Sequence, residues 1–298
     1  MPHNYFKEGV CQPPASRADD LKHMRNWLSG QHHLPALSDE HLYLFLNCCD
    51  YQLTKAKETI DNYYTLRTSS PELFGNRNPL LPEIQAILNV VNMIPMSWKT
   101  PEGYKVLLYR LTDYDSSKLP FITAVKTLFM FNDMRTSESG LVTGYIAIMD
   151  FKGVGLGHVA NVHLMTLKKG LTYIQDCLPA SLKAVHIINT PSCIDKIMML
   201  VKPLIKSELL GMLKFHGPPE DLADYVSLKS LPEEYGGEGE SFEKIYAEQR
   251  TLMEKDYIKW FQLEETLKAD ESKRTGKQNP YSEITQGAEG SFRKLAID

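Results

Sequence analysis

The sequence predicts an α/β domain preceded by a small all-helical domain. Three observations support this fold class. Segments 105–111, 144–151 and 184–189 are rich in β-branched and aromatic residues, as strands are. Amphipathic helical segments long enough for crossovers separate these strands, which indicates parallel pairing. Residues 16–67 show only helical periodicity.

The N-terminal part begins with a stretch, residues 1–15, that is expected to be a flexible leader ending in two prolines. Apolar residues then recur at helical spacing around 21–28, 42–49 and 56–63, and Ser38 is placed to cap the second helix. Three helices this short are expected to pack on the α/β domain rather than to fold alone.

The α/β part alternates in a regular order. After the strand at 105–111, Pro120 opens a helix. After the strand at 144–151, leucines and isoleucines from 164 to 178 recur every three or four residues. A helix from Ser192 and a short strand near 213–216 come after the third strand. From about residue 240 the chain is first helical and charged, then polar, and its end is expected to dock loosely.

The stretch MDFKGVGLGH, residues 149–158, resembles the start of a dinucleotide-binding loop. Gly153 and Gly155 fit that pattern, but His158 stands at the third glycine position, and the next helix is expected several residues later. The better interpretation is a tight turn in which glycine reaches positive φ.

The remaining constellations predict no enzyme. No G-x-S-x-G elbow is present, and the histidine pairs 32/33 and 158/163 have no cysteines or acids at metal-ligand spacing. The sequence therefore predicts no catalytic residue, no metal and no cofactor. A net charge of −4 gives no reason to expect nucleic acid. Five irregularly spaced cysteines and an N-terminus without a signal-like apolar run predict a cytoplasmic protein.

The segment 193–217 is amphipathic and rich in methionine. Ile194, Ile197 and Met198 share one helical face, and Pro203 comes shortly after. One interpretation is a core helix. The other is a mobile lid whose apolar face covers a cavity and makes transient contact with a membrane.

Together, AVHIINTP (184–191), KPLIKSELLGMLKFHG (202–217) and LPEEYGG (231–237) resemble the CRAL-TRIO family of lipid-transfer proteins, most of all its tocopherol- and retinaldehyde-binding branch. Segment 45–67 is similar to the family's N-terminal helical domain. The resemblance covers roughly 16–250. It implies a mixed, mostly parallel sheet and an apolar ligand pocket under a lid helix.

Strand alternation places Tyr145, Ala147 and Met149 on one face, and Val185 and Ile187 on one face of the neighbouring strand. The resemblance adds further expected ligand-binding residues: Phe131, Tyr173, Leu178, Ile194, Ile197 and Met198. Tyr145, Tyr173 or His186 is expected to orient a hydroxyl or carbonyl of the ligand.

The resemblance also implies a basic cluster that holds a phosphoinositide headgroup, but here Lys183 alone matches it. The other matching positions are not basic: Cys49, Ser181, Glu208 and Met212. Phosphoinositide-coupled release is therefore expected to be lost, or rebuilt from residues such as Lys202 and Lys206.

The predicted function is binding and transfer of a retinoid, carotenoid, tocopherol or similar lipid. The alternatives are a non-exchanging adaptor with the same fold, or a phosphoinositide-binding trafficking protein. The oligomeric state stays open. The predicted divisions are a leader (1–15), a helical domain (16–75), a lipid-binding domain (76–250), and a C-terminal helix with a polar tail (251–298).

Overall fold

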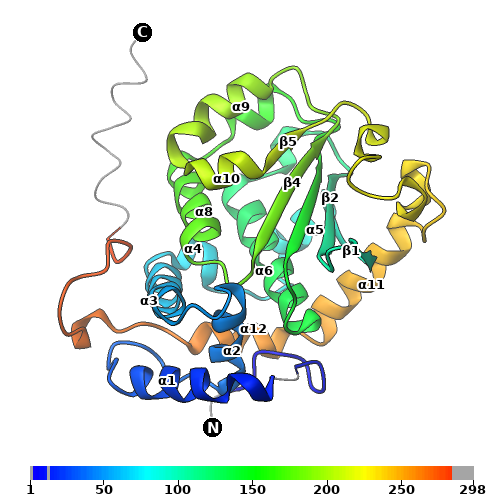
Figure 1. The fold of residues 1–298 in the computed structure, drawn as a ribbon. Coiled ribbons are helices and arrows are strands. Elements are labelled where there is room, and N and C mark those ends of the chain that lie inside the picture. Colours follow the sequence, from blue (N-terminus) through cyan, green and yellow to red (C-terminus); the bar gives the residue numbers. More distant parts are fainter. Residues whose placement is uncertain (1–2, 12–13, 284–298) are drawn as a thin grey trace.

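A computed structural model describes residues 3–11 and 14–283. Its centre is a five-stranded sheet in which the strands lie in chain order (Figure 1). The first two strands pair antiparallel, and each later pair is parallel. The sheet is therefore mixed and mostly parallel, as predicted. The strands are β1 (Val91–Lys99), β2 (Lys105–Leu111), β3 (Tyr145–Asp150), β4 (Leu182–Ile188) and β5 (Leu213–Phe215).

Strand β1 is absent from the sequence prediction, whereas β2 to β5 lie where strands were expected. Its sequence, VNMIPMSWK, contains Pro95, which cannot donate to a strand ladder. β1 is an edge strand with β2 as its one neighbour, and such a position tolerates proline. The short helix that precedes β1 is also absent from the sequence prediction.

Helices surround the sheet on its sides and at its lower end (Figure 1). One sheet face packs against α5, α6, α11 and α12. The opposite face is covered by residues 219–246. The main helices are α1 (Ala18–Ser29), α2 (Asp39–Cys48), α3 (Leu53–Ser69), α4 (Pro71–Phe74), α5 (Pro82–Leu88), α6 (Phe121–Ser139), α7 (Leu156–Ala160), α8 (Leu164–Asp176), α9 (Ile194–Val201), α10 (Ser207–Met212), α11 (Phe242–Lys255) and α12 (Ile258–Thr266). None of them is both long enough and apolar enough to cross a bilayer.

The N-terminal helices do not form an isolated core. Buried residues of α1 to α4 belong to one apolar cluster with Phe129 of α6 and Tyr173 of α8. Ser38 caps α2 as predicted, since its hydroxyl accepts a hydrogen bond from the His41 amide. The expectation that these helices pack on the α/β domain is confirmed.

The predicted flexible leader differs from the structure over residues 3–11. Tyr5 and Phe6 are buried against Leu44 and Trp260. The Tyr5 carbonyl accepts hydrogen bonds from Ser137 Oγ at 2.8 Å and from Trp260 Nε1 at 2.9 Å. Burial of the two aromatic side chains contributes more free energy than the segment loses in conformational entropy. The composition of the segment alone did not indicate this.

The glycine-rich stretch after β3 forms the expected tight turn. Gly153 has φ +83°, a conformation that other residues rarely adopt, and a Cβ there would lie 2.1 Å from the Tyr114 ring unless that ring moved. One expectation was wrong: α7 begins at Leu156, directly after Gly155. This helix has a single turn, too short to leave a periodic signal.

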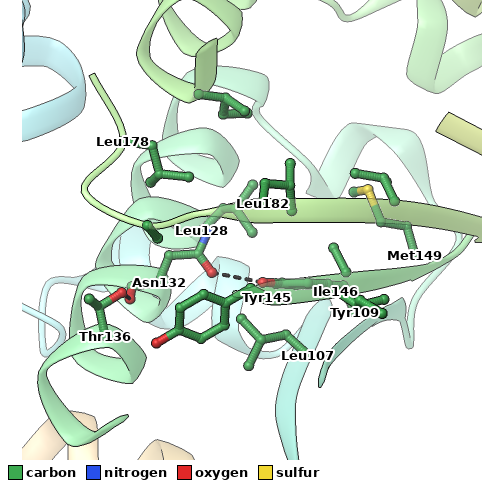
Figure 2. Close-up of a pocket in the computed structure, with 14 residues that line it drawn as sticks. Leu107, Tyr109, Leu128, Asn132, Thr136, Tyr145, Ile146, Met149, Leu178 and Leu182 are labelled. Atoms are coloured by element: carbon green, nitrogen blue, oxygen red, sulfur yellow. Dashed lines mark hydrogen bonds between the residues drawn. The ribbon is translucent and has the colours of Figure 1, made fainter. Parts of the chain in front are cut away.

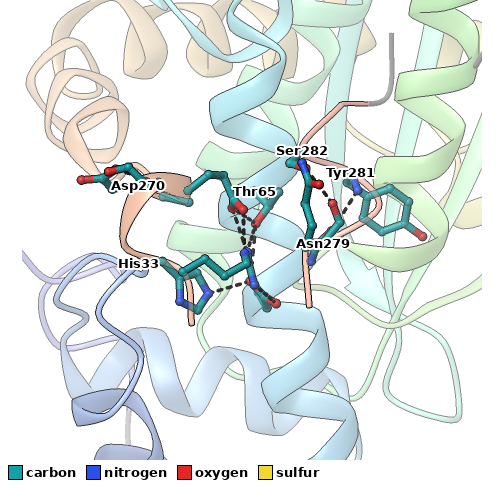
Figure 3. A network of polar contacts seen from close by, with 12 residues as sticks. His33, Thr65, Asp270, Asn279, Tyr281 and Ser282 are labelled. Carbon is teal, nitrogen blue, oxygen red and sulfur yellow. Dashed lines mark hydrogen bonds and ion pairs between the residues drawn. The ribbon is translucent and has the colours of Figure 1, made fainter. Parts of the chain in front are cut away.

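The polar C-terminal segment is docked more firmly than expected as far as residue 283, where the described part ends. Figure 3 shows this segment beside α3. Arg274 makes two hydrogen bonds with the Asp61 carboxylate, at 2.7 and 2.8 Å. Asn279 donates to the Asn62 side chain at 2.9 Å, and the Tyr281 hydroxyl donates to Asp176 at 2.9 Å. The rest of the predicted tail lies outside the described residues.

Replacing Arg274 by alanine is expected to lower the free energy of unfolding by about 1.5–3 kcal/mol, because it removes charged hydrogen bonds from the partly buried Asp61 carboxylate. Urea denaturation measures this. Lys273→Ala is the matched control, since its surface pair with Asp270 should contribute less than about 1 kcal/mol. Equal losses in both variants would contradict the assignment.

The same pair makes stability depend on pH. Burial would raise the pKa of Asp61, but hydrogen bonds from Arg274 and His33 outweigh it and hold that pKa below its usual value of 3.8. The stabilisation is therefore complete above that value and is lost as the pH falls below it. The difference in free energy of unfolding between wild type and Arg274→Ala should therefore shrink in that acidic range.

Candidate functional site

An apolar cavity of about 140 Å³ lies between the sheet and the helices α6 and α8. Figure 2 shows its walls: strands β2, β3 and β4 form one side, and side chains of α6 and of the chain after α8 form the other. The lining residues are Leu107, Tyr109, Leu128, Asn132, Thr136, Tyr145, Ile146, Ala147, Met149, Ile174, Leu178, Ala180, Leu182 and Val185.

Local structure explains how these side chains converge. Leu107, Ala147 and Val185 lie opposite one another in register, so their side chains share one face of the parallel strands. On α6, Leu128, Asn132 and Thr136 are spaced by four residues and therefore share one helical face. An apolar strand face thus meets a helix face that carries two polar groups.

The polar groups of the cavity are few, and most are satisfied. The Tyr109 hydroxyl donates to Asn132 Oδ1 at 2.7 Å, and the Thr136 hydroxyl donates to the Asn132 carbonyl at 2.9 Å. The Tyr145 hydroxyl is buried and has no hydrogen-bond partner among the described residues. Burial raises the pKa of Tyr109 and of Tyr145, so both phenols stay protonated at neutral pH. Because the Tyr145 oxygen has almost no accessible surface, it does not offer a hydrogen bond to the cavity in this arrangement.

A second, larger pocket of about 570 Å³ adjoins the cavity, and we call it the mouth pocket. It shares Ile174, Leu178, Ala180 and Leu182 with the cavity. Its charged residues are three lysines and four acids, which leaves it net negative: Lys55, Lys183, Lys206, Asp50, Glu58, Asp176 and Glu208. Lys206 forms an ion pair with Asp176, so only part of the positive charge is free for an anion.

A family model described as "CRAL/TRIO domain" matches residues 91–237, which include the whole sheet. The chain belongs to the CRAL-TRIO family. A second model, "Pinta-like, UBA domain", matches residues 14–84, which include the N-terminal helices. Members of the CRAL-TRIO family bind and transfer lipids.

The individual relatives have low sequence identity to this chain, but the similarity covers most of its length. The Mus musculus protein named alpha-tocopherol transfer protein-like is 26% identical over 260 residues, covering 86% of this chain and 75% of its own. Clavesin-1 of Xenopus laevis is 21% identical over 248 residues, covering 82% and 74%. The crystal structure of Sfh5 has a TM-score of 0.50 at 15% identity, covering 79% of this chain and 92% of Sfh5, and shows the likeness of fold.

In this CRAL-TRIO chain, four of the ten predicted ligand-binding residues line the cavity: Tyr145, Met149, Leu178 and Val185. Alternation also indicated Ala147. Leu107 and Tyr109 were missed, although they continue the same sheet face on the neighbouring strand. The lining residues of α6 were missed because two of them, Asn132 and Thr136, are polar. This face of the helix therefore lacks the apolar periodicity that would have indicated it.

Two of the predicted ligand-binding residues do not line this cavity. Phe131 packs edge-on against the Tyr109 ring, with centroids 6.0 Å apart. Tyr173 faces the N-terminal helices, where its hydroxyl accepts a hydrogen bond from Arg67 at 3.3 Å. His186, expected as a possible polar contact, lies on the opposite sheet face, stacked on His216. Of the three expected polar residues, Tyr145 alone lines the cavity.

The predicted lid residues do not line this cavity either. Ile194, Ile197 and Met198 belong to α9, at the upper end of the molecule beyond the carboxyl end of β4 (Figure 1). Ile187 shares the Val185 face but lies further along β4 toward that end. On the helix side the cavity is lined instead by side chains of α6 and by Ile174, Leu178 and Ala180, at and after the end of α8.

The positions compared with a phosphoinositide site do come together. Cys49, Ser181, Lys183, Glu208 and Met212 all line the mouth pocket. Of the two suggested replacements, Lys206 lines the pocket and Lys202 does not.

Proposed function

We propose that this protein binds a small hydrophobic molecule and transfers it between membranes. The observation that carries the proposal is the cavity itself, whose lining is apolar apart from Tyr109, Asn132, Thr136 and Tyr145. Retinoids, carotenoids, tocopherols and similar terpenoids fit such a lining, because each has a long apolar body with few or no polar groups. The name of the alpha-tocopherol transfer protein-like relatives supports the same class.

The size of the cavity adds a condition. A hollow of about 150 Å³ holds a molecule the size of benzene, so one of about 140 Å³ is too small for a whole terpenoid. Binding therefore requires that the wall shared with the mouth pocket, formed by Ile174, Leu178, Ala180 and Leu182, moves aside. Three of these side chains lie at or beyond the C-terminal turn of α8, where few backbone hydrogen bonds must break.

Membrane contact is proposed for the segment around α9. Met199 is 72% exposed, and Leu210 and Phe215 on the following elements are also exposed. A contiguous apolar patch on a surface marks a contact with a partner or a membrane, whereas single exposed apolar residues need none. We infer that these three side chains form such a patch and that an acyl-chain surface covers it.

The proposal is tested by extracting the purified protein with organic solvent and identifying the extract by mass spectrometry and by visible and near-ultraviolet absorbance. A stoichiometric terpenoid supports a carrier. Protein that carries no extractable lipid, and that takes up none from loaded vesicles, indicates the adaptor function instead.

Phosphoinositides are not expected to drive release. The mouth pocket is net negative and one of its lysines is paired, so it should repel a phosphorylated headgroup. In vesicle flotation, adding phosphatidylinositol bisphosphate should change binding by less than about twofold, and Lys183→Ala should behave as wild type. Tight binding that Lys183→Ala abolishes would contradict this.

A further inference from the structure

Three potential metal ligands from distant parts of the chain converge outside the lipid site. His3 belongs to the N-terminal segment, His41 to α2 and Glu264 to α12. Glu264 Oε1 lies 2.6 Å from His3 Nε2 and 2.9 Å from His41 Nε2. The side chains of His41 and Glu264 are each 1% exposed, and that of His3 is 14% exposed.

Two imidazole rings share one carboxylate oxygen in this arrangement. His3 Nε2 is buried and forms an ion-pair contact with Glu264 Oε1, but its geometry is not that of a hydrogen bond to any described residue. The same oxygen also faces His41 Nε2. One carboxylate oxygen and two imidazole nitrogens therefore lie within 4.8 Å of one another, as ligand atoms do around a metal ion.

The surroundings support the same interpretation. His41 Nδ1 lies 2.7 Å from Ser38 Oγ, so the ring is oriented with Nε2 toward Glu264. A second hydrogen bond of this kind is typical of histidines that bind metals. The rings of Tyr5 and Trp260 pack edge-on against the two histidines and limit access of solvent.

We propose that His3, His41 and Glu264 bind one divalent transition-metal ion, best suited to Zn²⁺. Zinc favours histidine nitrogen and carboxylate oxygen at about 2.0–2.2 Å, in four-coordinate sites. Tetrahedral bonds of that length place ligand atoms about 3.3 Å apart, so the observed triad needs only a small expansion. Water would supply the fourth ligand. The ion would tie residues 3–11 to α2 and α12, a structural role separate from lipid binding.

The test uses the full-length protein, stripped with a chelator and titrated with Zn²⁺ or Co²⁺. Wild type should bind one equivalent, measured by plasma mass spectrometry, and the Co²⁺ form should show the visible absorption of a tetrahedral site. His3→Ala should weaken binding at least about tenfold and abolish that absorption. His23→Ala, at an exposed position of α1, is the matched control and should bind as wild type.

Limited proteolysis gives an independent readout. Zn²⁺ should slow cleavage in the N-terminal segment of wild type but not of His3→Ala, which removes a ligand from the end of the chain and leaves the buried pair of His41 and Glu264 in place. Binding of no equivalent by wild type, or equal binding by wild type and His3→Ala, would overturn the proposal. The lipid recovered by solvent extraction should be the same whichever result the metal experiments give, because the proposed metal site is separate from the lipid cavity.

Discussion

Replacing Asp133 by asparagine is expected to lower the free energy of unfolding by about 3–5 kcal/mol, the loss expected when a buried charge loses its partner. Asp133, on α6, pairs with Arg67 of α3 and with Arg77. All three side chains are buried, at 3%, 6% and 0% exposure. The Arg67 guanidinium also donates to Tyr63, so its position is set by several contacts.

Urea denaturation of Asp133→Asn measures the loss. Glu238→Gln is the control, because its pair with Lys229 is on the surface and should contribute less than about 1 kcal/mol. A combined replacement of Arg67, Arg77 and Asp133 by Met, Met and Leu should recover most of the loss, since an apolar set needs no counter-charge. A loss below about 1 kcal/mol in Asp133→Asn would show that the arginines find other partners.

Replacing Ala147 by phenylalanine should abolish ligand binding while leaving the fold intact. Ala147 lies mid-strand between Leu107 and Val185, and its methyl group faces the cavity. A benzyl group there would occupy most of about 140 Å³. Because the ring enters existing space, the change in stability should stay within about 1–3 kcal/mol of wild type.

Fluorescence titration with all-trans-retinol as a probe checks this variant. The apparent affinity should fall at least about tenfold, that is by about 1.4 kcal/mol or more. Ala86→Phe, at an exposed position of α5, adds the same side chain elsewhere and should bind as wild type. Unchanged binding by Ala147→Phe would place the ligand outside this cavity.

The sequence was informative wherever a local pattern had a local cause. Alternation along 144–151 and 184–189 correctly indicated that Tyr145, Met149 and Val185 face the cavity, because strand geometry sets which way each side chain points. The leucine spacing from 164 onward predicted α8, and Gly153 marked a turn whose backbone other residues avoid.

The sequence was least informative where partners lie far apart along the chain. Tyr173 lies in an apolar stretch of sequence that would suit a ligand pocket. Its hydroxyl instead accepts a hydrogen bond from Arg67, which lies 106 residues earlier in the chain. Pro95 obscured an edge strand, and Tyr5 gave no sign that Trp260 would cover it. Each outcome depends on a contact that no periodicity encodes.

By itself, the sequence indicated the α/β fold class, the positions of β2 to β5 along the chain and the face of the sheet that meets the cavity, because the periodicity of strands and helices reflects local backbone geometry. Only the tertiary structure decided which helix faces that surface, how large the hollow is, and that α9 lies away from it. These depend on how far apart and at what angle packed elements sit, a balance of many side-chain contacts across the whole chain.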